Sequence, residues 1–244
     1  MTRTCVIPER LLAALRDARH LCILTGAGVS AESGVATFRE AQDGLWADYD
    51  PLQLATPEGF LDDPELVWRW YRWRRELVTK AQPNAAHLAI VELAQMVPRL
   101  TLVTQNVDNL HQRAGSNQAI EFHGNLFIDR CFDCKSEASA DTHEDVPRCG
   151  ACGGKLRPGV VWFGEPIAED AMNESFAAAS DCDVFMAIGT SSLVQPAAGL
   201  ANIAAASGAL TVEINPDPVR HGFDVVLEFE AGTAIPQVVE LLGR

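Results

Sequence analysis

The sequence has no long apolar run, and this absence excludes a protein built on membrane-spanning helices. No stretch approaches the roughly 20 consecutive apolar residues that a transmembrane helix needs. Residues 1–20 also lack the uninterrupted apolar core of a signal peptide. Leucines at helical spacing after Pro8 predict an ordinary first helix there instead. We therefore expect a cytoplasmic protein with no membrane partner.

Positive charge is also scarce. Lysine and arginine number 19 against 33 aspartate and glutamate residues, which gives a formal net charge of −14. Such a surface repels phosphate backbones, so nucleic acid is not an expected partner. The charge is compatible with attracting lysine-bearing protein segments, although an ordinary soluble surface is the simpler explanation.

The sequence lacks an even disulfide framework, because three of its seven cysteines (Cys5, Cys22 and Cys182) are isolated. These three are expected to be small buried residues in a reducing compartment. The other four form two Cys-x-x-Cys pairs that are separated by 14 polar, loop-like residues: Cys131, Cys134, Cys149 and Cys152. Two such pairs predict a closed tetrahedral site for one Zn²⁺ ion, which is structural because no ligand position stays open. A redox dithiol would need a single pair at a helix start.

A glycine-rich turn follows the first predicted strand, residues 20–25. Gly26, Gly28 and Ala31 fit the G-x-G-x-x-G/A pattern, in which small residues let the backbone approach a pyrophosphate at a helix start. A tight turn without any ligand is the alternative. The acidic ribose-binding residue usually found about 20 positions later has no convincing counterpart. The turn therefore predicts a nucleotide site of unusual geometry.

Residues 101–124 carry the strongest concentration of acid–base groups. The strand predicted at 100–103 ends at Gln105, Asn106 and Asp108, and a second strand at 119–122 leads to His123. Ligands of open α/β sheets bind where parallel strands end. These side chains are expected to form an active site.

Tyr71 and Arg74 lie three positions apart on a predicted helix, residues 64–80, and so share one helix face. A phenol and a guanidinium together would hold a carboxylate. The alternative is that the tryptophans of this helix are core residues and that its arginines face water.

Strands and helices alternate in the last third of the chain. Helices are predicted at 168–180, 196–207 and 233–242, strands at 183–188, 209–214 and 225–227, and an extended segment at the apolar centre of residues 155–165. A further helix is predicted at 84–95. This alternation predicts an α/β fold with a mostly parallel sheet covered by helices on both faces.

Taken together and in this order, the motifs resemble the sirtuin family of NAD-dependent protein deacylases, in a bacterial-type form. The matching segments are GAGVSAESGVATFR (26–39), TQNVDNLH (104–111), FHG (122–124), the paired cysteines, VVWFGE (160–165), GTS (189–191) and Asn215. The resemblance implies a Rossmann-like domain made of residues 1–46, 83–124 and 158–244. It also implies a small domain made of a helical insertion (47–82) and a four-cysteine zinc module (125–157).

The resemblance also implies roles for individual residues. His123 is the general base that activates a ribose hydroxyl of NAD, which is consumed as a co-substrate. The acyl oxygen of a modified lysine attacks the ribose as nicotinamide leaves, and water then releases free lysine and O-acyl-ADP-ribose. The implied NAD contacts are Gly26, Ala27, Gly28, Ser30, Ala31, Glu32, Phe38, Arg39, Trp46, Gln105, Asn106, Asp108, Gly189, Thr190, Ser191, Asn215 and Ala231.

One branch of the family, the desuccinylases and demalonylases, carries Tyr-x-x-Arg on this helix and a small residue that corresponds to Ala55. By resemblance, Tyr71 and Arg74 bind the free carboxylate of a succinyl or malonyl group. Residues 160–165 resemble the strand that pairs with the substrate backbone. The implied substrate contacts are Ala55, Tyr71, Arg74, Val161, Trp162, Phe163, Gly164 and Glu165. The expected partners are acyl-lysine proteins or peptides, bound by a monomer.

Two other functions stay open on sequence grounds. An ADP-ribosyltransferase would cleave NAD in the same way but use another acceptor, and a sensing module would bind NAD or ADP-ribose without turnover. A zinc-ribbon nucleic-acid binder is disfavoured by the acidic charge. A dehydrogenase is disfavoured because all four cysteines are used for zinc and the acidic ribose-binding residue is missing.

Overall fold

The computed structural model describes residues 5–35, 50–138, 144–219 and 222–244 of the 244-residue chain. Its centre is a six-stranded sheet in which every neighbouring pair is parallel. In spatial order the strands are β3 (Ile120–Glu121), β2 (Leu100–Thr104), β1 (Leu21–Thr25), β7 (Val184–Ile188), β8 (Leu210–Ile214) and β9 (Val225–Leu227). The strand order reverses between β1 and β7, which is the position where open α/β sheets bind ligands.

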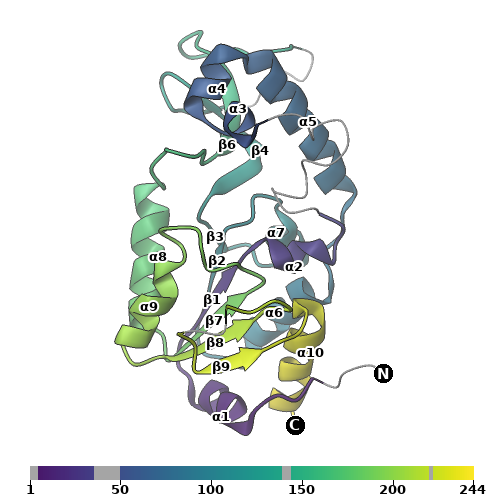
Figure 1. Ribbon diagram of the computed structural model, residues 1–244, viewed down its shortest axis with the longest axis vertical. Helices are drawn as coiled ribbons and strands as arrows, with labels where there is room; N and C mark the ends of the chain where they lie inside the picture. The colour runs from purple at the N-terminus through teal and green to yellow at the C-terminus, as the bar shows by residue number, and fades with distance from the viewer. Residues whose placement is uncertain (1–4, 36–49, 139–143, 220–221) are drawn as a thin grey trace.

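Helices cover both faces of this sheet (Figure 1). Because side chains alternate along a strand, Leu21 and Ile23 of β1 pack into one core, and Cys22 and Leu24 pack into the other. The first face carries α1 (Glu9–Asp17), α6 (Ala85–Met96) and α10 (Ala231–Leu242). The second face carries α8 (Glu169–Asp181) and α9 (Gly199–Ala206). Two short helices, α2 (Ala27–Ala31) and α7 (Leu110–Ala114), follow β1 and β2.

A second, antiparallel sheet stands above the first (Figure 1), and a separate apolar core joins it to three helices. Its strands are β5 (Glu137–Ala138), β4 (Gly124–Cys131) and β6 (Leu156–Val160), and the helices are α3 (Pro51–Leu54), α4 (Pro57–Asp62) and α5 (Pro64–Lys80). Trp68 donates its indole N–H to the Leu156 carbonyl, and Arg75 forms a 2.6 Å ion pair with Asp129. We propose that residues 47–82 and 125–157 form the small domain, with the remaining ranges forming the Rossmann-like domain.

The structure confirms the predicted α/β fold with its parallel sheet and its helices on both faces. The helix predicted at 64–80 has these bounds, because Asp63 caps its N-terminus and Pro64 occupies the first position. The helix predicted to start at residue 196 begins only at Gly199, after a turn. The three isolated cysteines are buried, as expected.

The extended segment predicted at the apolar centre of residues 155–165 is confirmed as β6 only as far as Val160, and a turn follows it. The Glu165 amide donates to the Trp162 carbonyl over 3.0 Å and closes a four-residue turn. Gly164 has φ +85° in this turn, a conformation that glycine adopts without steric cost. Sequence alternation cannot distinguish this turn from a strand, because the apolar residues Val161 to Phe163 precede the glycine directly.

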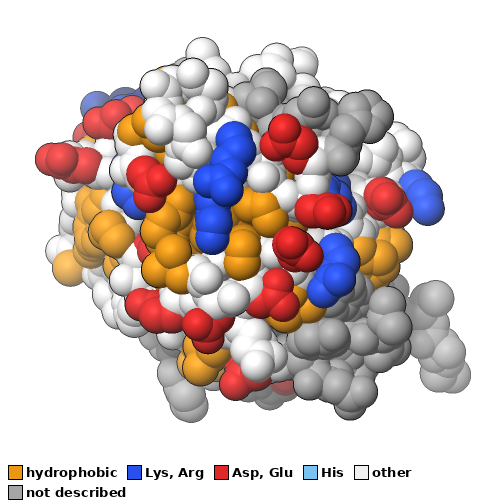
Figure 2. All heavy atoms as spheres, turned by 90° about the horizontal axis from the view of Figure 1, so that it is seen from above, with side chains coloured by type: hydrophobic (Ala, Val, Ile, Leu, Met, Phe, Trp, Pro, Cys, Tyr) orange, Lys and Arg blue, Asp and Glu red, His pale blue; other side chains and the backbone are white. Residues whose placement is uncertain are grey.

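No helix in the described ranges is both long and apolar enough to cross a membrane. Seen from the small-domain end, acidic side chains are spread around the face and outnumber the basic ones (Figure 2). This distribution agrees with the net charge of −14.

Candidate active site

A cleft of about 760 Å³ contains most of the predicted site residues. From the large sheet and its following turns it is lined by Gly26, Ala27, Gly28, Ser30, Gln105, Asn106, Asp108, His123, Gly189, Thr190 and Ser191. From the end of α3, from α5 and from the segment that follows β6 it is lined by Ala55, Tyr71, Arg74, Val161, Trp162, Phe163, Gly164 and Glu165. A second hollow of about 520 Å³, around Arg10 and Asp224, contains none of these residues.

Two backbone turns form the floor of the cleft at the point where the strand order reverses. The turn after β1 packs directly on the turn after β7, and the Gly28 amide donates to the Gly189 carbonyl over 2.8 Å. A Cβ atom on Gly28 would lie 2.8 Å from the Gly189 backbone, and Gly189 itself has φ +58°. Close packing therefore explains these glycines even without a ligand. The result is a floor of bare backbone, which suits a phosphate group.

A polar network fixes the amide and carboxylate groups that follow β2. Asn106 donates through Nδ2 to the Gly26 carbonyl (3.0 Å) and to Ser30 Oγ (3.1 Å). Ser30 Oγ in turn donates to Asp108 Oδ2 over 2.6 Å, and the Leu110 amide donates to Oδ1. Asp108 is 5% exposed, and its oxygens retain capacity for further hydrogen bonds. These side chains are held rigidly at the cleft wall.

The next pair along the cleft, Gln105 and Thr190, connects β2 to the turn after β7. Gln105 donates through Nε2 to Thr190 Oγ1 over 2.9 Å, and Asn215 donates through Nδ2 to the Thr190 carbonyl over 2.9 Å. Asn215 thus lies behind Thr190 and is not in the cleft lining. Its effect on the cleft is to position this turn.

His123 lies at the end of β3 with its ring in a defined tautomer. Its Nδ1 is 3.2 Å from the Gln105 carbonyl, which can only accept, so Nδ1 carries the proton and Nε2 keeps a lone pair. Burial lowers the pKa of His123 below its usual value of 6.5, although the hydrogen bond to Gln105 opposes this shift. The imidazole is therefore neutral at pH 7 and suited to accept a proton.

Tyr71 and Arg74 lie on the face of α5 that lines the cleft, beside Ala55. The hydroxyl of Tyr71 accepts a 2.8 Å hydrogen bond from the indole N–H of Trp162. Burial raises the pKa of Tyr71 to about 12, with Arg74 acting in the opposite direction, so the phenol stays neutral. Burial lowers the pKa of Arg74 below its usual value, and Tyr71 and Asp108 oppose that shift. A neutral donor and a cation therefore share this end of the cleft.

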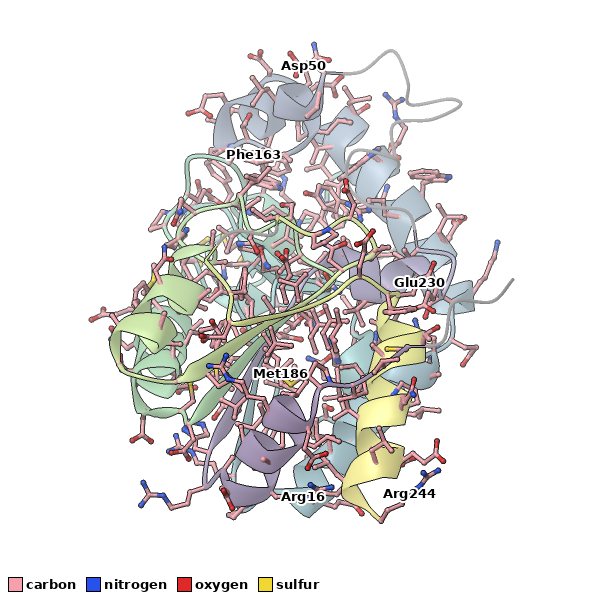
Figure 3. All side chains as sticks on the ribbon, turned by 60° about the horizontal axis from the view of Figure 1, so that its bottom comes forward. Arg16, Asp50, Phe163, Met186, Glu230 and Arg244 are labelled. Carbon is pink, nitrogen blue, oxygen red and sulfur yellow. The ribbon has the colours of Figure 1, made fainter. Side chains whose placement is uncertain are left out.

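Backbone amides in and directly before the turn from Trp162 to Glu165 donate hydrogen bonds to other parts of the protein. The Phe163 amide donates to the Ala55 carbonyl over 3.0 Å, and the Val161 amide donates to the His123 carbonyl over 2.8 Å. Glu165 accepts from the Trp162 amide and from Arg157. Figure 3 shows Phe163 between the helices of the small domain and the large sheet.

Several predicted NAD contacts do not line the cleft. Glu32 is exposed, and its carboxylate accepts the Gly232 amide at the start of α10 over 2.7 Å. Ala31 is exposed, and Ala231 is buried as the first residue of α10. Phe38, Arg39 and Trp46 lie outside the described residues.

The cleft also contains apolar residues that the sequence patterns did not indicate. They are Val35, Val107, Ile167, Met172, Val194 and Pro196. Met172 lies within α8 and the others lie in connecting segments, and no local signal separates such residues from ordinary core positions. Val35 and Val107 pack against the same core as Tyr71 and Trp162, whereas Ile167 and Met172 pack against a core of the large sheet, so apolar lining comes from both sides of the cleft.

The four paired cysteines meet at the tip of the β4–β6 sheet. Their sulfur atoms all lie within 4.8 Å of one another, with Sγ separations of 3.5 Å for Cys131 and Cys152 and 3.8 Å for Cys134 and Cys149. A tetrahedral ion with Zn–S bonds of about 2.3 Å requires sulfur separations of about 3.8 Å. The Cys134 amide points at Cys131 Sγ, and the Gly154 amide points at Cys152 Sγ. The cluster therefore fits one structural Zn²⁺ ion.

Comparison with known proteins gives consistent matches. The Sir2 family matches residues 26–196. The chain is 51% identical over 237 residues to NAD-dependent protein deacylase 1 of Pseudomonas aeruginosa, which covers 92% of this chain and 95% of that protein. It is 48% identical over 250 residues to the NAD-dependent protein deacylase of Methylococcus capsulatus, with 97% of each covered. A solved Sir2 homolog–NAD complex has 43% identity and a TM-score of 0.91, over 100% of this chain and 96% of that one.

Proposed function

The chain belongs to the Sir2 family and is an NAD-dependent protein deacylase, and we propose that it removes succinyl and malonyl groups from lysine as well as acetyl groups. The observation that carries the proposal is the placement of Tyr71 and Arg74 beside Ala55, in the same cleft as His123. The same cleft therefore contains a proton acceptor, His123, and a binding site for a carboxylate.

The residues of the cleft fit NAD. The bare backbone of Gly26, Gly28 and Gly189 suits the phosphates, and the fixed groups of Asn106 and Asp108 suit the amide and hydroxyl groups of nicotinamide and ribose. When bound, NAD supplies an electrophilic ribose carbon and the acceptor of the acyl group. The other proposed NAD contacts that line the cleft are Ala27, Ser30, Gln105, Thr190 and Ser191. Ala31, Glu32, Asn215 and Ala231 lie outside that lining, and Phe38, Arg39 and Trp46 lie outside the described residues.

His123 is the proposed general base. Its protonated Nδ1 is held by the Gln105 carbonyl, which directs the Nε2 lone pair away from that contact. The proton that it accepts comes from a hydroxyl group of bound ribose. No serine or cysteine nucleophile is required, because the acyl group is transferred to the co-substrate.

Tyr71 and Arg74 are the proposed acyl-selecting pair. An acyl group that ends in a carboxylate accepts one hydrogen bond from the phenol and a charge-assisted bond from the guanidinium. An acetyl group reaches neither. The small side chain of Ala55, which is 5% exposed, leaves space for the longer chain. The turn of Val161, Trp162, Phe163, Gly164 and Glu165 is proposed to contact the lysine-bearing segment.

The test compares succinyl-lysine and acetyl-lysine peptides with Arg74→Met. Loss of a charge-assisted bond of about 1.5–3 kcal/mol should lower kcat/KM for the succinyl peptide by roughly 10- to 150-fold and leave acetyl turnover nearly unchanged. Arg72→Met on the same helix is the matched control, because Arg72 contacts the Trp68 ring and the Glu144 carbonyl and does not line the cleft.

Equal losses for both peptides would contradict the carboxylate-binding role. The mass of the products also separates this function from ADP-ribosylation, since a deacylase yields acyl-ADP-ribose and leaves the target protein unlabelled.

The proposal extends to the state of the protein in the cell. We propose a cytoplasmic monomer acting on acyl-lysine proteins. None of the seven cysteines, all of which lie in the described ranges, forms a disulfide, and this suits a reducing compartment.

A further inference from the structure

The hydroxyl of Tyr71 has an unusual hydrogen-bond arrangement. Trp162, 91 positions further along the chain, donates its indole N–H to the Tyr71 oxygen over 2.8 Å. An indole N–H can only donate, so the tyrosine oxygen is the acceptor and its own proton must go elsewhere. Among the described residues this is the one hydrogen bond of Tyr71, and both side chains are at most 3% exposed.

We propose that Trp162 is a positioning residue that directs the Tyr71 proton into the cleft and thereby sets the preference for acyl groups ending in a carboxylate. The proposal rests on the acyl selectivity put forward above and extends it to a residue outside the Tyr-x-x-Arg pair. Without the indole N–H, the Tyr71 hydroxyl is able to rotate about its C–O bond. Its proton then points in other directions than into the cleft.

Trp162 is itself fixed by a chain of contacts from β6. Its backbone amide donates to Glu165 Oε2 over 2.9 Å, and Arg157 binds the other carboxylate oxygen. The Arg157 guanidinium also lies 3.3 Å from the centre of the Trp162 ring, and Phe60 packs against the same ring at 5.4 Å. The indole therefore has one orientation, and its N–H points at a fixed position.

The effect on Tyr71 follows from hydrogen-bond cooperativity. A hydroxyl that accepts a hydrogen bond becomes a stronger donor, and the effect is larger where the dielectric is low. Because burial raises the pKa of Tyr71 to about 12, the phenol keeps its proton at every pH at which the protein would be assayed. Tyr71 is thus a permanent donor that complements the cationic Arg74.

The experiment replaces Trp162 in the full-length protein by its benzothiophene isostere, which keeps the ring shape and carries sulfur in place of N–H. Trp162→Phe is the second variant. Trp68→Phe is the matched control, since Trp68 is buried in the same core and also donates one indole hydrogen bond, but to the Leu156 carbonyl. KM and kcat are measured for succinyl- and acetyl-lysine peptides in each variant.

The isostere should raise KM for the succinyl peptide by about 2- to 10-fold, which corresponds to one neutral hydrogen bond, with kcat unchanged. The acyl end bound by Tyr71 takes no part in bond making, so its loss affects binding alone. KM for the acetyl peptide, whose acyl group does not reach Tyr71, should rise by a clearly smaller factor, because there the isostere affects only the turn proposed to contact the substrate. In a Tyr71→Phe background, the isostere should have no further effect.

Three results would overturn the proposal. They are an unchanged succinyl KM, equal changes for the two peptides, and an effect that persists when Tyr71 is phenylalanine. The Arg74→Met result separates this inference from the proposed function. If Arg74→Met is selective and the isostere is not, only the role of Trp162 fails. If Arg74→Met is not selective, the carboxylate-binding function itself fails.

Discussion

His123 illustrates how one residue's chemistry depends on its surroundings. Its position in FHG indicated a base, but the tautomer came from the Gln105 carbonyl, 18 positions earlier in the chain. Burial then lowers its pKa. A base must be deprotonated to act, so a lowered pKa extends activity toward lower pH.

We expect kcat/KM to stay near its maximum as the pH falls through 6.5 and to be half lost only below that value. His123→Ala should lower turnover by about 10²- to 10⁴-fold, the usual contribution of a general base. A pH–rate profile at saturating NAD tests this. A half-maximal point at or above pH 6.5 would contradict the burial effect, and retained turnover in His123→Ala would favour a sensing module instead.

At the scale of elements, the four-cysteine cluster shares an apolar core with α5, the helix that carries Tyr71 and Arg74. Cys131 and Cys149 belong to the same apolar core as Phe60, Trp68 and Tyr71. The described tryptophans occur at 68, 70, 73 and 162, and all of them belong to this core, pack against it or line the adjoining cleft. Tryptophan fluorescence therefore reports mainly on the small domain.

Removal of the zinc ion should first disrupt the small domain and leave the large sheet folded. We expect one zinc ion per chain by elemental analysis and a clear fall in that content in Cys134→Ser. Chelation should change tryptophan fluorescence and lower deacylase activity while most of the far-UV circular dichroism is retained, because the large sheet has its own cores. Cys182→Ser, outside the cluster, is the control. Simultaneous loss of both optical signals would show that the two domains unfold together.

At the scale of the whole molecule, two buried histidines link the fold to pH. His87 on α6 and His111 on α7 lie with ring centres 4.8 Å apart. Burial lowers the pKa of His87 to about 4, opposed by Asp108, and lowers that of His111 to about 3. Unfolded histidine takes up a proton near pH 6.5. The stability that depends on these neutral rings is complete above pH 6.5 and is lost as the pH falls toward 4.

The free energy of unfolding should therefore fall by up to about 1.4 kcal/mol per pH unit for each of these histidines between pH 6 and pH 4.5. His111→Gln should reduce the slope of the unfolding free energy against pH by the contribution of one histidine. The lost hydrogen bond to Thr25 lowers stability at every pH and leaves this slope unaffected. Denaturant unfolding at several pH values measures the slope. Parallel lines for the variant and the unmodified protein would refute the assignment.

The sequence by itself determined the features that depend on local pattern. Side-chain periodicity marked the strands and helices, because one face of each must be apolar, and Pro64 marked the first turn of α5. The spacing of the cysteines predicted their cluster, since each pair needs only a short turn to meet. Motif order was enough to identify the family.

Only the tertiary structure decided which groups face each other across long sequence distances. The hydrogen bond between Tyr71 and Trp162, and the closed turn that ends at Glu165, depend on how β6 packs against α5 and α4. The same holds for Glu32, which binds the start of α10, 200 positions later. Such contacts arise from the summed packing of several elements, and no local pattern of residues encodes them.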